Sequence, residues 1–382
     1  MIRVCHLITG LDVGGAENTL VRMCRALADQ GYHQLVITMI PGGQLAGDLQ
    51  RAGITVRSLD MRRGWPSLFS ALRLVRELRR FRPDVLQTWM YHADLLGTIV
   101  RPFISRARLV WNLRCSDMRG DRRWSLKWLV SSLALLSSIP HAIIVNSRSG
   151  WADHVRAGYR QSRCVLISNG VDTDRFRPLP EERAALRAVL GVPLEATVIG
   201  QIARVHPMKD HTTFLAAAGQ FFATHPNAHF VLVGPGCEPG SEPLAKMIHE
   251  QGLGSHITLL GSRSDLPRIY PALDLVSLSS AFGEGTPNVL LEALACGVPC
   301  VATDVGDCRS VIGPCGLVVP PREPSALAKA WDEVLRQDLA VSARSYALAS
   351  FADSTAAAAY NALYRNLLRS EAATMTTARS PS

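Results

Sequence analysis

The sequence predicts an α/β protein built from two doubly wound domains, each with a mostly parallel sheet. Short apolar runs alternate with stretches of helical periodicity, and this alternation implies right-handed crossovers between parallel strands. The alternation stops near residues 169–185 and then starts again. The length of 382 residues exceeds that of one ordinary core and suits two.

The first half contains six short apolar runs of the length expected for buried strands. They are residues 4–8, 34–39, 56–59, 85–88, 108–112 and 142–146. Helical periodicity fills the gaps, for example over residues 15–30 and 66–81. Each such helix is expected to connect one parallel strand to the next.

The second half repeats this organisation after a polar connection. Its predicted strands are residues 197–202, 229–233, 257–260, 275–278, 298–303 and 316–318. The connection is marked by charged residues and prolines that break both periodicities, namely Asp172, Asp174, Arg175, Arg177, Pro178 and Pro180. An alanine-rich helix over residues 354–368 has one apolar stripe, which contains Tyr360 and Tyr364 and is expected to pack back on the first domain. Residues 370–382 are expected to form a disordered tail.

Composition and cysteine usage place the chain among globular proteins of a reducing compartment. Nine cysteines are scattered without a C-x-x-C pair, so free and mostly buried thiols are expected. The first residues look like a strand and lack the ordered regions of a signal peptide, which predicts a cytoplasmic protein.

Charge is distributed unevenly along the chain. Residues 1–178 contain 26 lysines and arginines against 13 aspartates and glutamates, whereas the remainder contains 15 against 19. A strongly basic half suits anionic lipid, a diphosphate-bearing substrate or nucleic acid.

Two basic stretches of this half also contain apolar residues. One has the arginines 62, 63, 73, 76, 79, 80 and 82 around a helically spaced apolar set, Trp65, Leu68, Phe69, Leu72, Val75 and Leu78. The other begins with Arg122 and Arg123 and has Trp124 and Trp128 four residues apart. Neither is long enough to span a bilayer. Two interpretations stay open: a helix lying on a membrane surface, or an ordinary amphipathic helix with its apolar side packed inward.

Residues 282–299 are the most informative segment of the chain. Thr286 is a suitable N-cap and Pro287 a suitable first helical residue, while Gly297 and Pro299 end the helix. Glu284 therefore lies in a loop before a helix, and Glu292 lies on that helix. The amides of Thr286 to Val289, with the positive end of the helix dipole, form an expected anion site. An anion site between two carboxylates suits a nucleotide-sugar, which has a diphosphate centre and hydroxylated ends.

Glycines and basic residues follow other predicted strands. Gly14 and Gly15 come after the first strand and open a helix, and their spacing is not that of a dinucleotide-binding turn. Arg204 and Lys209 follow the first strand of the second half, at the edge where α/β sheets bind ligands. Both cations suit phosphate oxygens.

Further candidates also lie at predicted strand ends. His92 follows an apolar strand and suits a hydrogen bond to a sugar hydroxyl or a phosphate, and Arg114 and Asp117 are weaker candidates of the same kind. In the second half, Gly234 lies in a glycine-rich loop, and Arg263 and Leu266 follow the next strand, where they are placed to line a nucleobase pocket. For each of these residues an ordinary turn or packing role is the alternative.

Taken together and in order, these elements resemble the retaining family-4 glycosyltransferases (glycosyl transferases group 1), of the kind that build bacterial polysaccharides and glycolipids. The matching motifs cover nearly the whole chain and comprise Gly14-Gly15, His92, Asn169-Gly170-Val171-Asp172, Arg204 to Asp210, Gly234-Pro-Gly236, Glu284 to Glu292 and Gly316-Leu-Val-Val-Pro. The paired-glutamate segment is the most specific of them. One departure is that Asp307, Cys308 and Arg309 stand where the family often has a second glycine and an acidic residue.

This resemblance implies the GT-B fold, in which two Rossmann-like domains face a cleft and a C-terminal helix crosses back to the first domain. The implied boundaries are 1–170 for an acceptor-binding domain, 171–353 for a nucleotide-sugar-binding domain, 354–369 for the helix and 370–382 for the tail. No metal and no cofactor is implied. The partners are a nucleotide-sugar donor and a saccharide or lipid-linked acceptor, with an anionic membrane surface as a further candidate and no nucleic acid.

The resemblance also implies roles for individual residues. Arg204 and Lys209 would hold the donor phosphates, Glu292 the ribose and Glu284 the transferred sugar, while His92 would lie near the reaction centre. Gly14 and Gly15 would close over the diphosphate. The full donor-binding set is Gly14, Gly15, Arg204, Lys209, Gly234, Arg263, Leu266, Glu284, Gly285, Thr286, Pro287, Asn288 and Glu292, and the catalytic set is Glu284, His92, Arg204 and Lys209.

Two other classes of function are weighed against a glycosyltransferase. Another enzyme of the same fold, such as a nucleotide-sugar epimerase or a sugar phosphorylase, would use the same donor residues. A non-catalytic module, including a basic nucleic-acid binder, is disfavoured because the four charged donor residues are intact and base-stacking aromatics are few. The sequence leaves open which sugar, nucleotide and acceptor are used.

Overall fold

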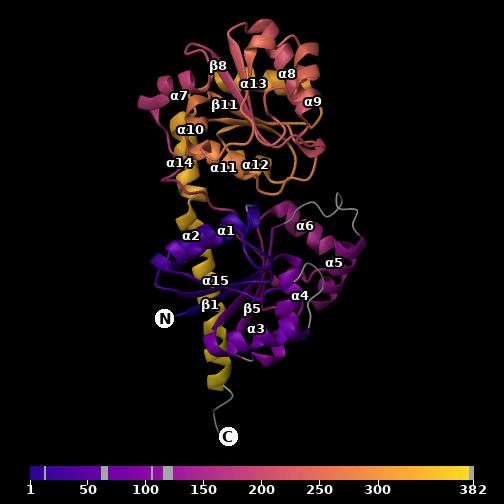
Figure 1. The fold of residues 1–382 in the computed structure, drawn as a ribbon, viewed down its shortest axis with the longest axis vertical. Coiled ribbons are helices and arrows are strands. Elements are labelled where there is room, and N and C mark those ends of the chain that lie inside the picture. The colour runs from indigo at the N-terminus through magenta and orange to yellow at the C-terminus, as the bar shows by residue number, and fades with distance from the viewer. Residues whose placement is uncertain (13, 62–67, 105, 115–123, 378–382) are drawn as a thin grey trace. The chain divides into compact units, whose positions relative to one another are not determined.

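A computed structural model shows the chain as two compact units, Met1–Gly170 with Asp353–Ser382, and Val171–Ala352 (Figure 1). The structure describes residues 1–12, 14–61, 68–104, 106–114 and 124–377, and for residues 68, 243 and 370–377 it describes the backbone alone. Each unit has its own sheet and its own core, so each is described by itself.

The first unit contains a seven-stranded parallel sheet in the order β3-β2-β1-β4-β5-β6-β7. Its strands are β1 (Arg3–Ile8), β2 (His33–Thr38), β3 (Thr55–Ser58), β4 (Val85–Trp89), β5 (Arg108–Leu113), β6 (Ala142–Val145) and β7 (Cys164–Leu166). All six strands predicted in this half are confirmed. Strand β7 was not predicted, because a three-residue edge strand is too short to show a pattern.

Helices cover both faces of this sheet. They are α1 (Gly15–Asp29), α2 (Ala46–Arg51), α3 (Leu68–Phe81), α4 (Met90–Val100), α5 (Trp124–Leu136), α6 (Arg148–Arg156) and α15 (Asp353–Thr377), with the short 3₁₀ turns η1 (Arg101–Phe103) and η2 (Gln161–Arg163). One core joins α1, α2 and α15 to the sheet through Leu20, Leu49 and Tyr364. The other core joins α3, α4 and α5 to it through Leu74, Leu96 and Leu133.

The C-terminal helix α15 packs within the first unit, although 182 residues of the second unit separate it in sequence from Gly170. The Tyr364 hydroxyl donates to the Gln87 side chain, and the Tyr360 hydroxyl accepts from Asn112 Nδ2 at 2.9 Å. The helix continues to Thr377, so the predicted disordered tail is wrong for residues 370–377. Alanine, glutamate and methionine in this stretch are good helix formers. Residues 378–382 lie outside the described part of the chain.

The second unit contains a six-stranded parallel sheet in the order β10-β9-β8-β11-β12-β13. Its strands are β8 (Thr197–Ile202), β9 (Ala228–Val233), β10 (Ile257–Leu259), β11 (Leu275–Leu278), β12 (Cys300–Thr303) and β13 (Gly316–Val319). All six predicted strands are confirmed, and β12 begins two residues later than expected, after Pro299. Proline cannot donate to a ladder, which accounts for this start.

Helices also cover both faces of the second sheet. They are α7 (Arg183–Val189), α8 (His211–Thr224), α9 (Glu242–Glu250), α10 (Leu266–Ile269), α11 (Asn288–Ala295), α12 (Cys308–Ile312), α13 (Pro324–Leu335) and α14 (Ala340–Phe351), with 3₁₀ turns η3 (Pro180–Glu182), η4 (Pro207–Lys209), η5 (Gly254–His256) and η6 (Tyr270–Ala272). One core gathers α8, α9 and α13, and the other gathers α7, α11, α12 and α14. The beginning of the predicted connection is fixed on the second unit, because Arg344 donates to the carbonyls of Thr173 and Phe176.

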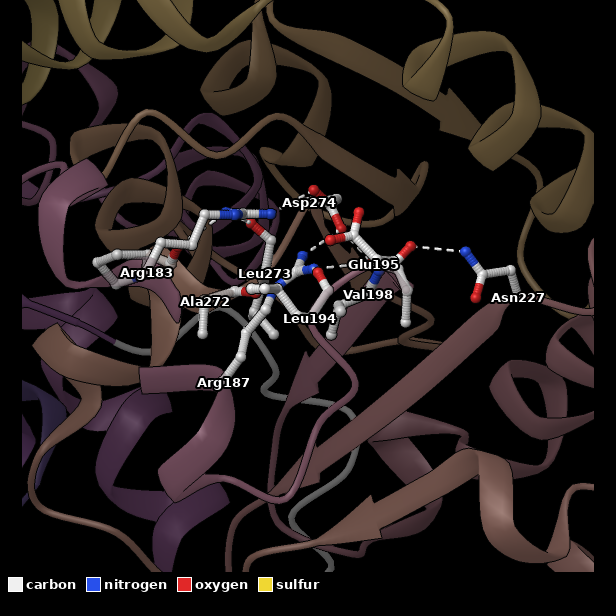
Figure 2. Close-up of polar contacts among 11 residues, drawn as sticks. Arg183, Arg187, Leu194, Glu195, Val198, Asn227, Ala272, Leu273 and Asp274 are labelled. Atoms are coloured by element: carbon white, nitrogen blue, oxygen red, sulfur yellow. Dashed lines mark hydrogen bonds and ion pairs between the residues drawn. The ribbon is translucent and has the colours of Figure 1, made fainter. Parts of the chain in front are cut away.

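A partly buried ionic cluster ties α7 to the amino end of β11 (Figure 2). Asp274 accepts from both Arg183 and Arg187, and also from the amide of Val198 at 2.7 Å. The Arg187 side chain is 4% exposed and donates further to the carbonyls of Ala272 and Ala196 at 3.0 and 2.9 Å. A buried guanidinium needs this complete set of acceptors, so the cluster sets the spacing of α7 and the sheet.

We expect Asp274→Ala to lower the free energy of unfolding by about 3–5 kcal/mol, because it leaves the buried Arg187 without its counter-ion. Urea-induced unfolding followed by circular dichroism measures this. The matched control is Asp332→Ala, which removes exposed contacts with Arg336 and His225 and should cost less than about 1 kcal/mol. Equal losses in the two variants would show that the cluster does not stabilise the unit.

Candidate active site

The order of the second sheet reverses between β8 and β11. In doubly wound sheets, ligands bind at the carboxyl ends of strands at such a point, because the two loops diverge to opposite faces. The loop after β8 contains Arg204 and Lys209, and the loop after β11 contains Glu284. The structure therefore brings the charged residues predicted from two distant segments to one edge of this sheet.

Lys209 and Glu284 form an ion pair across this point. Lys209 Nζ contacts Glu284 Oε1, and the same oxygen accepts from the Ser280 hydroxyl. The side chains are 16% and 7% exposed, so the pair is largely removed from water. Screening is weak there, and any anion that enters meets fixed charges rather than mobile ones.

Backbone contacts hold the Lys209 side of the pair. The Ser279 hydroxyl contacts the carbonyls of Lys209 and Asp210, each at 2.9 Å, and the amide of Ala281 donates to the carbonyl of Met208 at 2.8 Å. Asp210 has a positive φ of 46° and caps α8 by accepting from the amide of Thr213. The loop after β8 is thus bound directly to the loop after β11.

A third loop holds the Glu284 side. The amide of Asp307 donates to the carbonyl of Gly285 at 3.0 Å. Gly306 has a φ of 62°, and a Cβ atom there would lie 2.1 Å from the carbonyl oxygen of Glu284. Only glycine fits this approach. Ser279, Ser280 and Gly306 were missed by the sequence analysis, although two serines directly after a buried strand were a usable signal.

The loop with Asp307, Cys308 and Arg309, which departs from the family pattern, is held by contacts within itself. Arg309 pairs with Asp304 at 2.6 Å, and Cys308 is fully buried. Burial and the nearby Glu284 carboxylate raise the pKa of the Cys308 thiol, which stays neutral. These side chains pack and pair within the loop, and its backbone fixes the segment that carries Glu284.

Helix α11 begins one residue later than predicted. Pro287 is the N-cap, with extended backbone angles of −73° and 112°, and the first helical residue is Asn288. The predicted N-cap Thr286 and first helical residue Pro287 are therefore both corrected. The carbonyl of Pro287 accepts a hydrogen bond from the amide of Leu290 at 3.1 Å. This bond forms the first turn of the helix, although Pro287 itself has an extended backbone.

Glu292 lies on α11, as predicted, and is held by a buried tyrosine. The Tyr270 hydroxyl donates to Glu292 Oε2 at 2.8 Å. Burial and the adjacent carboxylate raise the pKa of Tyr270, so it remains a donor at all ordinary pH values. Tyr270 is fully buried and thereby orients the half-buried Glu292.

The remaining candidates of the second unit differ in how they are engaged. Arg204 is exposed and pairs with no other described side chain. Gly234 has a φ of 139°, and a Cβ there would lie 2.4 Å from the carbonyl oxygen of Ala203, so this loop packs tightly on the end of β8. Arg263 forms two hydrogen bonds to Asp265 at 2.8 and 2.6 Å, and Leu266, the first residue of α10, packs against the core.

In the first unit the corresponding reversal lies between β1 and β4. Gly14 is the N-cap of α1, and Gly15 is open, with nothing within 4 Å of the place of a Cβ. The Glu17 carboxylate folds back against Gly14, where a Cβ would meet its Oε2 at 2.3 Å. The positive end of α1 therefore already has a carboxylate beside it, and burial raises the pKa of that carboxyl.

His92 is exposed at the third position of α4, at the same edge. The preceding turn is strained, because Met90 has a φ of 70°, which a long side chain rarely adopts. Trp89 is fully buried before it and donates to His6 Nδ1 at 3.4 Å. Burial lowers the pKa of His6 to about 4, so this histidine is a neutral acceptor.

The Arg114 guanidinium is occupied by contacts within the first unit. It donates to the side chains of Asn112 and Asn169 and to the Tyr360 hydroxyl, and its guanidinium lies 5.2 Å from the Trp89 ring centroid. Asp117 lies outside the described residues. A cavity of about 770 Å³ in the second unit lies at the amino ends of β11 and β12, lined by Leu273, Pro299 and Ala340 among others, and so at the edge opposite Glu284.

Two sequence profiles match the chain, one in each half. The profile described as Glycosyltransferase Family 4 matches residues 13–175, and the profile described as Glycosyl transferases group 1 matches residues 196–337. The chain belongs to the family-4 glycosyltransferases. The resemblance to this family, predicted from the sequence, is thereby confirmed.

Curated relatives agree with this membership. D-inositol 3-phosphate glycosyltransferase of Corynebacterium urealyticum is 27% identical over 364 residues, which are 86% of this chain and 84% of the relative. 2-Deoxystreptamine N-acetyl-D-glucosaminyltransferase of Streptomyces fradiae is 28% identical over 354 residues, covering 83% and 82%. This family-4 glycosyltransferase is thus an enzyme of the hexosyltransferase class.

Solved structures show the same architecture. Anabaena HepE in complex with UDP and glucose is 24% identical, with a TM-score of 0.76, and the match covers 98% of this chain and 100% of that one. Sucrose-phosphate synthase from Thermosynechococcus elongatus is 20% identical, with a TM-score of 0.77, covering 96% and 100%. The family-4 glycosyltransferase has the GT-B fold, as predicted.

We expect Gly306→Ala to reduce transfer at least tenfold, because the added Cβ would displace the backbone of Glu284. Initial-rate assays with saturating and limiting donor measure this. The matched control is Gly240→Ala, which imposes a similar positive φ, 83°, with open space around the Cβ. A rate in Gly306→Ala equal to that of the control would show that this glycine does not position Glu284.

Proposed function

We propose that the enzyme transfers a sugar from a nucleoside-diphosphate sugar to a saccharide acceptor with retention of anomeric configuration. The observation that supports this most is the ion pair of Lys209 and Glu284 at the switch point of the second sheet, beside exposed Arg204 and the amino end of α11. Cations there suit a diphosphate, and a carboxylate suits sugar hydroxyls. The Anabaena relative in complex with UDP-glucose supports a donor of this class.

In the proposed reaction the bond between the anomeric carbon and the diphosphate oxygen breaks, and its electron pair goes to that oxygen. The acceptor hydroxyl oxygen bonds to the same face of the anomeric carbon, and its proton goes to the departing phosphate. No protein nucleophile is needed on this route. Lys209 and Arg204 stabilise the charge that develops on the leaving diphosphate, because they are placed before the reaction begins.

The two glutamates bind the two ends of the donor in this proposal. Glu284 accepts hydrogen bonds from the transferred sugar through the oxygen that Ser280 and Lys209 do not occupy. Glu292 accepts from the nucleotide ribose, with one of its oxygens held by Tyr270. Gly234, Arg263 and Leu266 line the nucleobase side. Gly285, Thr286, Pro287 and Asn288 complete the diphosphate site.

The first unit supplies the acceptor side. His92, exposed at the carboxyl edge of the first sheet, is proposed to lie near the reaction centre, and Gly14 and Gly15 to approach the diphosphate. The curated relatives are named for small polar acceptors, D-inositol 3-phosphate and 2-deoxystreptamine. We propose a saccharide acceptor carried on a lipid, in polysaccharide or glycolipid synthesis on the cytoplasmic side of a membrane, with no metal required.

We expect Lys209→Ala to lower kcat by about 10²–10³-fold, because the leaving diphosphate loses a preorganised cation. Glu284→Ala should also abolish most transfer, because the hydroxyl groups of the transferred sugar lose the carboxylate that accepts their hydrogen bonds. The matched controls are Lys246→Ala and Glu250→Ala, an exposed pair on α9. Release of the nucleoside diphosphate in a coupled assay measures all four. Near-normal turnover by Lys209→Ala or Glu284→Ala would refute the site.

A thermal-shift screen of nucleoside diphosphates and nucleotide-sugars identifies the donor. We expect stabilisation by one nucleotide series that is unchanged by EDTA and lost in Glu292→Ala. Tyr270→Phe keeps the carboxylate but removes its hydrogen bond, so it should weaken the shift rather than remove it. Stabilisation that disappears with EDTA would contradict the metal-free mechanism, and no shift with any nucleotide would favour a phosphorylase or a binding module.

A further inference from the structure

Exposed large apolar side chains are concentrated in one part of the first unit. Among the described residues, eight of fourteen such side chains lie between residues 69 and 139. They are Phe69, Leu72, Ile99, Phe103, Trp124, Trp128, Leu135 and Ile139. Single exposed apolar residues are ordinary, but a concentration in three consecutive helices and their connections marks an interaction surface.

Helix α5 shows this most clearly, because it has two apolar sides. Leu129, Val130 and Leu133 are buried in the core, whereas Trp124 and Trp128 are 74% and 62% exposed. The two indole rings lie 6.2 Å apart on the solvent side. The segment thus packs one apolar side inward, as an ordinary amphipathic helix does, and also presents two tryptophans to solvent. Lys127 is exposed beside them and pairs with no other described residue.

Helix α3 repeats the combination of apolar and basic residues. Val75 and Leu78 are buried, as an amphipathic helix requires, but Phe69 and Leu72 are 84% and 58% exposed. The exposed side continues with arginines at positions 73, 76, 79 and 80. Arg73 pairs with Asp60 at 2.8 Å, and Arg76 pairs with no described residue. Of the predicted set, Trp65 and the arginines 62, 63, 122 and 123 lie outside the described residues, as does the side chain of Leu68.

The amino-terminal turns of α3 and α5 lie at one edge of the unit. Helices α3, α4 and α5 share one core and cover one face of the sheet (Figure 1). In parallel α/β units each helix begins beyond the carboxyl end of a strand and runs back along the sheet. Phe69, Leu72, Trp124 and Trp128 therefore lie at the carboxyl edge, where α4 also presents His92.

We propose that these four apolar side chains, with Arg73, Arg76 and Lys127, bind the surface of an anionic lipid bilayer. We call these seven residues together the apolar rim. Tryptophan beside lysine and arginine is the composition that favours the boundary between headgroups and acyl chains. No described helix is long and apolar enough to cross a bilayer, so contact would be with the surface.

Charge distinguishes a bilayer from the other candidates for this surface. A second copy of the chain would bring its own arginines against Arg73 and Arg76. The acidic neighbours are already engaged, Asp60 by Arg73 and Glu77 by Arg57 at 2.7 Å. The excess of cations in residues 1–178 adds long-range attraction to anionic headgroups. Membrane binding rests on the proposed function in one respect only: its purpose would be to bring a lipid-carried acceptor to the edge that contains His92.

Co-sedimentation of the full chain with vesicles tests this without any assay of transfer. We expect binding to vesicles of phosphatidylcholine with 30% phosphatidylglycerol, and little binding to phosphatidylcholine alone. Trp124→Ser with Trp128→Ser should reduce binding at least tenfold, and Arg73→Ser with Arg76→Ser should reduce it several-fold and weaken its salt dependence. The matched control is Val189→Ser with Val341→Ser, which removes comparably exposed apolar residues of the second unit.

The nucleotide thermal shift of each variant separates this proposal from the proposed function. If the tryptophan or arginine variant loses vesicle binding but keeps its thermal shift with nucleotide, the apolar rim is the membrane-binding surface, even if no transfer is ever detected. Binding that is equal in the tryptophan variant and the control would overturn the proposal. A variant that changes the oligomeric state in size-exclusion chromatography, with vesicle binding unchanged, would assign the rim to self-association instead.

Discussion

The ion pair of Lys209 and Glu284 joins two loops that 75 positions separate in sequence. It exists because β8 and β11 are neighbours at the point where the strand order reverses, so their carboxyl ends open side by side. Two opposite charges removed from water stabilise each other there, and neither is free to move away. The proposed donor site is built around this constraint.

The supports of that pair are mostly backbone contacts. Ser279 binds the carbonyls of Lys209 and Asp210, and Gly306 allows the next loop to approach the carbonyl of Glu284. A side chain can be replaced with local consequences, whereas a backbone contact fixes a whole segment. The loops after β8, β11 and β12 are therefore joined to one another by direct contacts, which suits preorganised electrostatic stabilisation of a leaving diphosphate.

A comparable dependence holds the last helix of the chain on the first unit. Arg114 joins Asn169, near the end of the first segment, to Tyr360 on α15, and stacks over the buried Trp89. Asn112 and Gln87 bind the same helix through its tyrosine hydroxyls. The sheet edge that presents His92 is thus completed by a helix encoded at the other end of the sequence.

The amino-acid pattern by itself determined twelve of the strands, the two-domain organisation and the position of Glu284 before a helix that contains Glu292. Apolar runs and turn residues act locally, so they can be read from one segment at a time. Which residue each side chain pairs with, and how far each side chain is exposed to solvent, were decided only by the tertiary structure. Arg263 is paired with Asp265, Glu17 covers the start of α1, and Trp124 and Trp128 face solvent. Periodicity shows that a helix has an apolar side, but only the packing of its neighbours decides which apolar residues they cover.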